Sequence, residues 1–330
     1  MGLNILFISF LLGLLFQSQQ IQATQATNLA EAAKLHIETV RLYKEEKFSE
    51  ALVLAKKVIE IREKLLPQND ALLATSYTNL GYLYRGLGKY YDAERALKKA
   101  LNIEESRAGN DHVNQTELLT SIGWLLHAQN NPMDAEPFFK RAIAATEKSY
   151  GTDHKELAEQ LYHLAKFYEK ISKPGKAVPL FDRMIAIRVK VFGEASNETK
   201  EAVEYNACAL QQDKKVDQAD LYWKRSNDIE TALHPVIGQV ETGVLTGSAT
   251  KKVQPAYPEY ARATKVQGAV IVHVIINESG IVEEARTLCG SDLLAPASEE
   301  AARKWEFTTT KLNGKPVKVQ GRLTFTFVLR

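Results

Sequence analysis

The amino-acid sequence predicts a multidomain protein in which an all-α solenoid of helical repeats is followed by a small α+β domain. Three observations support this fold class. Alanine recurs every 42 residues from Ala51 to Ala219, the helical hydrophobic period stops after Glu230, and an alternation typical of β-strands begins after Gly268. With 330 residues, 45% hydrophobic and 25% charged, the chain has the composition of a soluble globular protein with two or three domains.

Residues 1–26 are expected to be a secretory signal peptide. Residues 5–16 form an apolar run that is too short to cross a bilayer comfortably and has the length of a signal-peptide core. Thr24 and Ala26 supply small residues at the two positions that a signal peptidase reads. No Lys or Arg precedes the apolar run, which is atypical of a signal peptide, so an uncleaved membrane anchor is the alternative.

The 42-residue period predicts pairs of antiparallel helices. Small residues stand twelve positions before the last four repeated alanines, and large apolar residues stand four positions after them. Small side chains mark places where two helices cross closely, and the larger ones fill the seam and are expected to wedge against the next repeat. The three sets are Ala51, Ala93, Ala135, Ala177 and Ala219; Gly81, Gly123, Ala165 and Ala207; and Leu97, Phe139, Phe181 and Trp223.

This pattern resembles the tetratricopeptide repeat, and the 42-residue period resembles its kinesin-light-chain variant. The resemblance covers five repeats within residues 27–230, although Thr39 and Asn206 depart from the expected small and apolar residues. It implies a concave groove lined by the first helix of each pair. Peptide binding in this groove is the functional interpretation; the alternative is that its aromatic residues pack against neighbouring helices and its charges are solvated. The family's groove positions correspond to Tyr82, Arg85, Trp124, His127, Lys166 and Glu169.

The remaining motifs predict neither catalysis nor a metal site. The sequence contains no Gly-rich phosphate loop, HExxH or CxxC, so we expect no enzyme activity and no cofactor. His112 and His154 are 42 residues apart, but equivalent loops of successive repeats explain them, and a third ligand is missing. The net charge of +2 gives no field that would recruit nucleic acid. Cys208 and Cys289 fall in separate predicted domains, so two buried free thiols are favoured over a disulfide.

Residues 231–252 are predicted to be a linker that leads into a first short strand, and residues 253–330 to be the α+β domain. The expected order is a short helix, two strands separated by a Gly280 turn, a second helix and a C-terminal strand after the Asn313-Gly314 turn. The aromatic residues expected to supply much of the core are Tyr257, Trp305, Phe307, Phe325 and Phe327.

This last segment resembles the C-terminal domain of TonB-family energy transducers. The resemblance rests on Tyr257-Pro258, Ala261, Gly268 with its alternating valines, Gly280, Ala301, Trp305 with Phe307, and the closing aromatic strand. It implies a periplasmic domain whose last strand pairs with an extended segment of an outer-membrane receptor. The implied partner-binding residues are Gln254, Pro255, Tyr257, Arg322, Leu323, Thr324, Phe325, Thr326, Phe327 and Val328. Core packing is the alternative role for Tyr257, Phe325 and Phe327.

Two functional hypotheses follow from these resemblances. The first is a non-enzymatic periplasmic protein that contributes to envelope transport by strand addition to an outer-membrane receptor, while the repeats bind a further protein. The second is an interaction scaffold in which the repeat groove is the main site, without energy transduction. Complete energy transducers carry a spaced Ser and His in a membrane helix and a Pro-rich spacer; here the apolar run holds only Ser9, and just 10 prolines are scattered along the chain. Coupling to the proton gradient is therefore in doubt, and self-pairing of the last strand stays open.

Overall fold

The structure, a computed structural model, describes residues 2–110, 112–233, 240–244 and 249–329. The linker predicted for residues 231–252 lies partly outside this described range. The chain divides into two compact units, Met1–Thr152 and Asp153–Arg330. The second unit contains both the last helical repeats and the C-terminal sheet.

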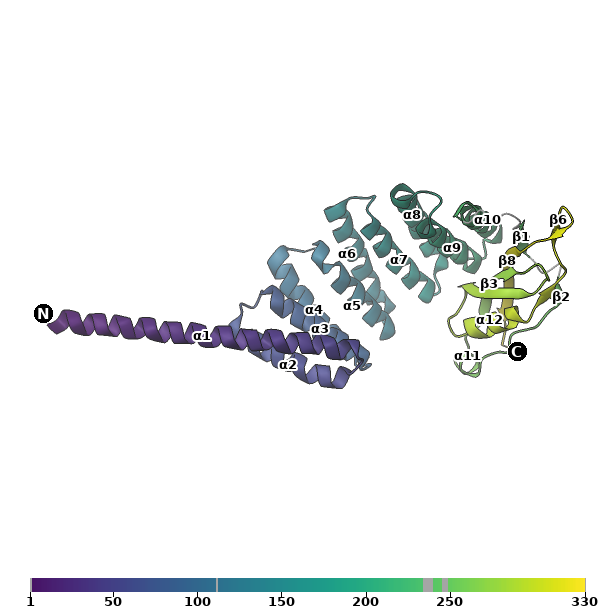
Figure 1. The fold of residues 1–330 in the computed structure, drawn as a ribbon. Helices are drawn as coiled ribbons and strands as arrows, with labels where there is room; N and C mark the ends of the chain where they lie inside the picture. The colour runs from purple at the N-terminus through teal and green to yellow at the C-terminus, as the bar shows by residue number, and fades with distance from the viewer. Residues whose placement is uncertain (1, 111, 234–239, 245–248, 330) are drawn as a thin grey trace. The chain divides into compact units, whose positions relative to one another are not determined.

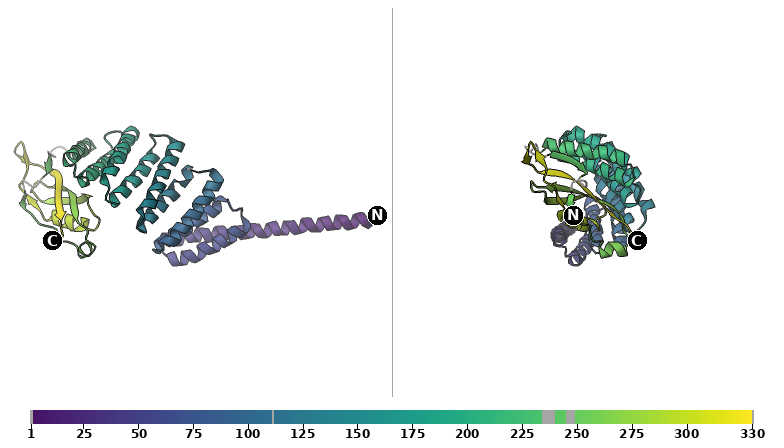
Figure 2. Two further views of the ribbon diagram at one scale, coloured as in Figure 1. Left: turned by 180° about the vertical axis from the view of Figure 1, so that it is seen from behind. Right: turned by 90° about the vertical axis from the view of Figure 1, so that its right-hand side faces the viewer.

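The first unit consists of helices that pack side by side as antiparallel neighbours (Figures 1 and 2). A single 3₁₀ turn, η1 (Val113–Gln115), precedes α5, and the side chain of His112 caps this turn by accepting from the backbone N–H of Asn114. His154 caps α7 of the second unit in the same way, which accounts for the two histidines at equivalent loop positions. The helices of the first unit are α1 (Gly2–Lys44), α2 (Phe48–Leu65), α3 (Ala71–Gly86), α4 (Tyr90–Ala108), α5 (Thr116–Ala128) and α6 (Pro132–Tyr150).

The second unit continues the same helix pairs and then forms the α+β domain (Figure 1). Its helices are α7 (Lys155–Lys170), α8 (Pro174–Phe192), α9 (Asn197–Gln212), α10 (Val216–Leu233), α11 (Glu259–Ala263) and α12 (Ala295–Arg303). Its strands are β1 (Val240–Val244), β2 (Ala249–Lys251), β3 (Gly268–Ile276), β4 (Val282–Cys289), β5 (Glu306–Phe307), β6 (Lys311–Leu312), β7 (Lys315–Pro316) and β8 (Val319–Phe327). The fold class predicted from the sequence is confirmed.

The 42-residue period is visible in the turns that join the two helices of each pair. The second helices begin at Phe48, Tyr90, Pro132, Pro174 and Val216. The middle residue of each preceding turn has a positive φ, between 58° and 70°, and these residues are Glu46, Gly88, Asn130, Ser172 and Lys214. One left-handed residue therefore reverses the chain in every pair, although only Gly88 adopts this conformation without steric cost.

The repeated small residues form the helix crossings, as the sequence predicts. Each of the five repeated alanines is fully buried. A Cβ built on Gly123 would lie 2.8 Å from the Phe139 ring, and one on Gly81 would lie 2.4 Å from Leu97. Within each helix pair, Leu97 therefore lies directly over Gly81 and Phe139 lies directly over Gly123. No larger residue fits at either glycine.

The C-terminal domain is built on a four-stranded sheet with the order β1-β8-β3-β4. Strand β8 is antiparallel to β3 along Val319–Phe327 and parallel to β1. The valines of β3 point to one face, where they pack with Ala301 and Ala302 of α12. The aromatic residues expected in the core are buried there, except that Tyr257 is only half-buried. The predicted Asn313-Gly314 turn joins the small β6–β7 hairpin.

Candidate protein-interaction site

Strand β8 is paired along its whole length on one side and along only part of its length on the other. The β3 side is paired from Val319 to Phe327. On the opposite side β1 pairs with Val319, Gln320 and Arg322, and no described strand pairs with residues 323–327. Within this stretch Leu323, Phe325 and Phe327 are buried, whereas the side chains between them are exposed. Among the described residues, this row of backbone groups has no strand partner on the side away from β3.

The outer edge of β4, at the opposite side of the sheet, is blocked by side chains from α12. The carboxylate of Glu299 accepts a hydrogen bond of 2.9 Å from the backbone N–H of Thr287. The guanidinium of Arg303 donates to the backbone oxygen of Ala285 at 3.0 Å and to Glu299 at 3.3 Å. Burial alone would raise the pKa of Glu299, but the hydrogen bonds from Thr287 and Arg303 outweigh it and lower this pKa. An added strand would have to break these contacts, so the two edges of the sheet are not equivalent.

The segment before α11 lies against the open end of β8. The ring of Tyr257 meets Phe327 edge-on at 5.3 Å, and its hydroxyl donates to the backbone oxygen of Val266 at 2.5 Å. The indole N–H of Trp305 donates to the backbone oxygen of Val253 at 2.7 Å. Gln254 is exposed and Pro255 is half-buried. These contacts hold the predicted partner-binding residues of this segment beside the same end of the sheet.

Arg322 differs from the other predicted edge residues because its side chain is used inside the second unit. Its guanidinium lies 5.0 Å from the ring centre of Trp223, and one of its nitrogens donates to the Asn227 side chain at 3.1 Å. Both partners belong to α10. Arg322 therefore attaches the sheet to the last repeat.

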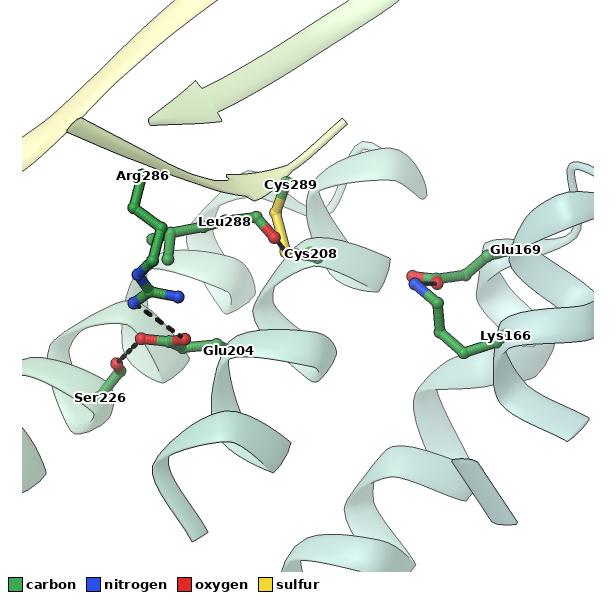
Figure 3. The surroundings of a disulfide bond; sticks show 8 residues. All are labelled: Lys166, Glu169, Glu204, Cys208, Ser226, Arg286, Leu288 and Cys289. Atoms are coloured by element: carbon green, nitrogen blue, oxygen red, sulfur yellow. Dashed lines mark hydrogen bonds and ion pairs between the residues drawn. A yellow bond between two sulfur atoms is a disulfide. The ribbon is translucent and has the colours of Figure 1, made fainter. Parts of the chain in front are cut away.

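The expectation of two free thiols is wrong, because Cys208 and Cys289 form a disulfide (Figure 3). Their Cα atoms are 5.5 Å apart although the residues are separated by 81 positions in the sequence. The bond joins α9 to the end of β4. The prediction failed because it treated the two predicted domains as separate bodies, whereas the outer face of the sheet packs on the last helix pair.

A buried cluster surrounds this disulfide. Trp223 of α10 and Ile271 of β3 are both nearly inaccessible and pack around it with small side chains of α9. Glu204 lies beside the cluster; it accepts from the Ser226 hydroxyl at 3.0 Å and lies 3.8 Å from Arg286 (Figure 3). Burial raises the pKa of Glu204, and the positive charge of Arg286 only partly opposes this.

His273 of β3 is a further titratable group whose surroundings shift its pKa. Its Nε2 lies 3.2 Å from the side-chain oxygen of Gln320. Because that oxygen can only accept, Nε2 carries the proton of the neutral imidazole. Burial lowers the pKa of His273 to about 4; the hydrogen bond to Gln320 opposes this effect, and the nearby Arg286 adds to it.

In the first unit, the predicted groove residues lie in two small clusters. Tyr82 donates to Glu117 at 2.5 Å, and Arg85 lies 4.9 Å from the Tyr82 ring centre. Trp124 meets the His127 ring at 5.9 Å and the ring of Phe139 at 5.2 Å. A cavity of about 90 Å³ opens beside Tyr82 and is lined by Thr39, Val40, Tyr43, Asn79, Tyr82 and Leu83. Trp124 therefore packs against neighbouring rings, whereas Tyr82 also forms part of the wall of a cavity.

The two remaining groove residues, Lys166 and Glu169, lie on α7 of the second unit and pair with each other. Their charged atoms are 2.5 Å apart, and the Glu169 side chain is only 6% exposed (Figure 3). The ammonium of Lys166 also lies 5.5 Å from the ring centre of Tyr205 on α9. This pair is therefore integrated into the helix packing, in contrast to the exposed Arg85.

Several residues that shape the site were missed by the sequence reasoning. Glu299 is not among the predicted site residues, and only the structure shows that its carboxylate occupies the edge of β4. Strand β1 falls within the predicted linker, where a first strand was expected but without a partner. Among the described residues, no group of three or more His, Cys, Asp and Glu side chains is placed to hold a metal ion. Within the same residues, no helix has the length and apolarity needed to span a membrane.

Comparison with known proteins confirms both resemblances. Residues 253–329 match the family described as the Gram-negative bacterial TonB protein C-terminal, and residues 42–106 and 72–148 match the tetratricopeptide repeat. The chain thus combines a repeat domain with a TonB C-terminal domain, and both classes point to protein partners. Domains of this TonB family are usually periplasmic. The comparison with curated proteins found no significant match.

Solved structures resemble the helical part. A protein from Podosopora anserina with nearly identical TPR-like repeats of the kinesin light chain type superposes with a TM-score of 0.56 at 17% identity, covering 63% of this chain and 99% of that one. BtubC (BKLC) from P. vanneervenii gives 0.53 at 17%, with 65% and 91% covered. The apo form of RapI gives 0.51 at 12%, with 61% and 71% covered. At such identities the likeness establishes the fold alone.

Proposed function

We propose that this protein is a non-enzymatic periplasmic adaptor whose β8 edge accepts an extended segment of an outer-membrane receptor, and that it contributes in this way to envelope transport. The observation that carries the proposal is the difference between the two sheet edges: β4 is blocked by Glu299 and Arg303, whereas no described strand pairs with residues 323–327 on the free side of β8. Main-chain hydrogen bonds along this stretch would supply affinity, and the alternate side chains would supply selectivity.

The disulfide supports the proposed compartment. Disulfides form and persist in oxidising environments such as the bacterial periplasm and are rare in the cytosol. The bond between Cys208 and Cys289 buries both sulfur atoms within the second unit. Such a bond is expected in a chain that is exported from the cytosol, and this agrees with the proposed signal peptide in residues 1–26.

Site-specific photo-crosslinking in intact cells tests the proposal. A photoreactive residue at Thr326, whose exposed side chain lies within the open stretch, is expected to capture an outer-membrane receptor. The same residue at Lys315, which is exposed in the β6–β7 hairpin, is the matched control and should capture none. If Thr326 and Lys315 give the same products, strand addition at β8 is excluded.

The second candidate function is a scaffold whose repeat groove is the main binding site. The cavity beside Tyr82 favours it, because such a cavity admits a side chain of a bound peptide. A photoreactive residue at the exposed Arg85 would then capture a partner that Thr326 does not. Capture of protein only from Arg85 would place the scaffold function above strand addition.

A further inference from the structure

The edge of β8 that would receive a partner is partly occupied by a strand of the same chain. Strand β1 runs parallel to β8 and pairs with Val319, Gln320 and Arg322. Beyond Arg322 the pairing with β1 stops, although β8 continues to Phe327. One half of the edge therefore holds an internal strand, and the other half is unpaired by any described strand.

Strand β1 is connected on both sides to elements that have contacts of their own. After β1 the chain must reach β2, which begins at Ala249 and pairs with β5, outside the four-stranded sheet. Before β1, α10 ends at Leu233 and attaches to the sheet through Trp223 and Arg322. Strand β1 is thus tethered at both ends by elements with their own contacts, and it is kept at a high local concentration next to β8.

We propose that β1 is an internal competitor for the β8 edge: residues 240–244 hold the first half of this edge in the resting protein, and a partner strand that uses the whole edge displaces them. This inference rests on the proposed strand addition and adds its regulation. In the resting protein a partner can pair only beyond Arg322, so it makes few main-chain hydrogen bonds. Release of β1 extends the available edge from residues 323–327 to residues 319–327 and strengthens the binding.

The test uses the full chain with two substitutions in β1. Proline removes a backbone N–H and fixes φ, so it breaks strand pairing. The backbone N–H groups of adjacent strand residues point to opposite sides. The double variant Glu241→Pro with Thr242→Pro therefore removes one N–H on the side of β8, whichever of the two residues supplies it. Glu241→Ala with Thr242→Ala is the matched control because it removes the same side chains and keeps both N–H groups. Neither substitution touches β8 itself.

The first measurement is hydrogen exchange of the two variants without any partner. Amides within Val319–Arg322 are expected to exchange at least tenfold faster in the proline variant than in the alanine control, while those of Val270–Val274 in β3 stay unchanged. Unchanged exchange at Val319–Arg322 would show that β1 does not hold the edge, and the inference would be wrong. Strand addition would survive that result if Thr326 still crosslinked to a receptor.

The second measurement uses a labelled synthetic peptide of residues 239–246, which contains the β1 sequence. Fluorescence anisotropy should show at least tenfold tighter binding to the proline variant than to the alanine control, in which tethered β1 competes with the peptide. Equal binding to both variants overturns the competition. Absence of binding to both, together with faster exchange at Val319–Arg322, would show that the edge accepts no strand in trans, so the proposed function would fail as well.

Discussion

Cys208 at the C-terminal part of α9 and Cys289 at the end of β4 are covalently joined, so the last helical repeat and the TonB C-terminal domain are held against each other. The contacts that surround this bond are modest. The ion pair between Lys170 and Asp292 is largely exposed, and Arg286 approaches Glu204 only to 3.8 Å. Exposed ion pairs contribute little to stability. The disulfide, the small buried cluster around Trp223 and the contacts of Arg322 with α10 therefore carry most of the attachment.

Reduction of the disulfide should lower the stability of the second unit. In the chain-entropy model, a closed loop of this length stabilises the folded state by about 4.5 kcal/mol. The unfolding temperature, followed by circular dichroism, should fall when a dithiol reductant is added to the wild-type protein. The double variant Cys208→Ser with Cys289→Ser should start at the lower temperature and should not respond to the reductant. A reductant effect of equal size in both proteins would exclude this interpretation.

His273 should make the stability fall as the pH decreases. Its pKa is lowered from 6.5 to about 4, so the folded state favours the neutral imidazole. The stabilisation is complete above pH 6.5 and is lost as the pH falls through about 4, with a total of about 3 kcal/mol. His273→Gln retains a donor for Gln320 and does not titrate. Urea unfolding between pH 7 and pH 4 should show a smaller loss of stability in this variant than in wild type; parallel pH profiles would contradict the prediction.

Glu204 should make the stability fall as the pH increases, which is the opposite of the effect of His273. Because burial raises its pKa, the folded state favours the neutral acid, whose stabilising effect is complete below pH 4.5 and is lost as the pH rises through the raised pKa. Glu204→Gln keeps an acceptor for Ser226 and removes the charge. We expect this variant to be about 1 kcal/mol more stable than wild type at pH 7, with a difference that shrinks towards pH 4.5. A less stable variant at pH 7 would show that the attraction to Arg286 outweighs the cost of burial.

Gly123 should tolerate no side chain. Its built Cβ would lie 2.8 Å from the Phe139 ring, so Gly123→Ala forces helices α5 and α6 apart. Overpacking of this kind costs about 1–3 kcal/mol. Thermal unfolding of the variant measures the loss, and the double variant Gly123→Ala with Phe139→Leu should lose less than the sum of the two single variants. If the two losses of stability are strictly additive, the methyl group introduced at position 123 does not contact Phe139.

Glu299 should protect the protein from edge-to-edge association. Glu299→Ala removes the carboxylate that occupies the N–H of Thr287 and leaves the edge of β4 available for pairing. Sedimentation velocity is expected to show a concentration-dependent dimer in this variant. Glu300→Ala is the matched control, because Glu300 pairs with the exposed Lys304 of the helix end and not with β4 in the described part of the chain, so this variant should stay like wild type. If the two variants sediment alike, Glu299 does not protect the protein from edge-to-edge association.

The parts of the structure that follow from local patterns could be predicted from the sequence. The buried alanines, the helix crossings at Gly81 and Gly123, and the valine face of β3 all reflect a hydrophobic period that each segment carries by itself. What could not be predicted depends on contacts between distant segments. The disulfide requires the outer face of the sheet to meet α9, and the pairing of β1 requires the linker to return to the last strand. The hydrophobic period of a single segment does not predict either of these contacts.

The disulfide also changes what a protease can do to this molecule. Residues 208–289 form a covalently closed loop that includes the whole stretch between the last helix pair and the end of β4. A single peptide-bond cleavage anywhere inside this loop separates no fragment, because the two pieces stay joined through the sulfur atoms. The chain can therefore be nicked next to β1 and still present its repeats and its β8 edge as one molecule, and the cleavage becomes visible only after the disulfide is reduced.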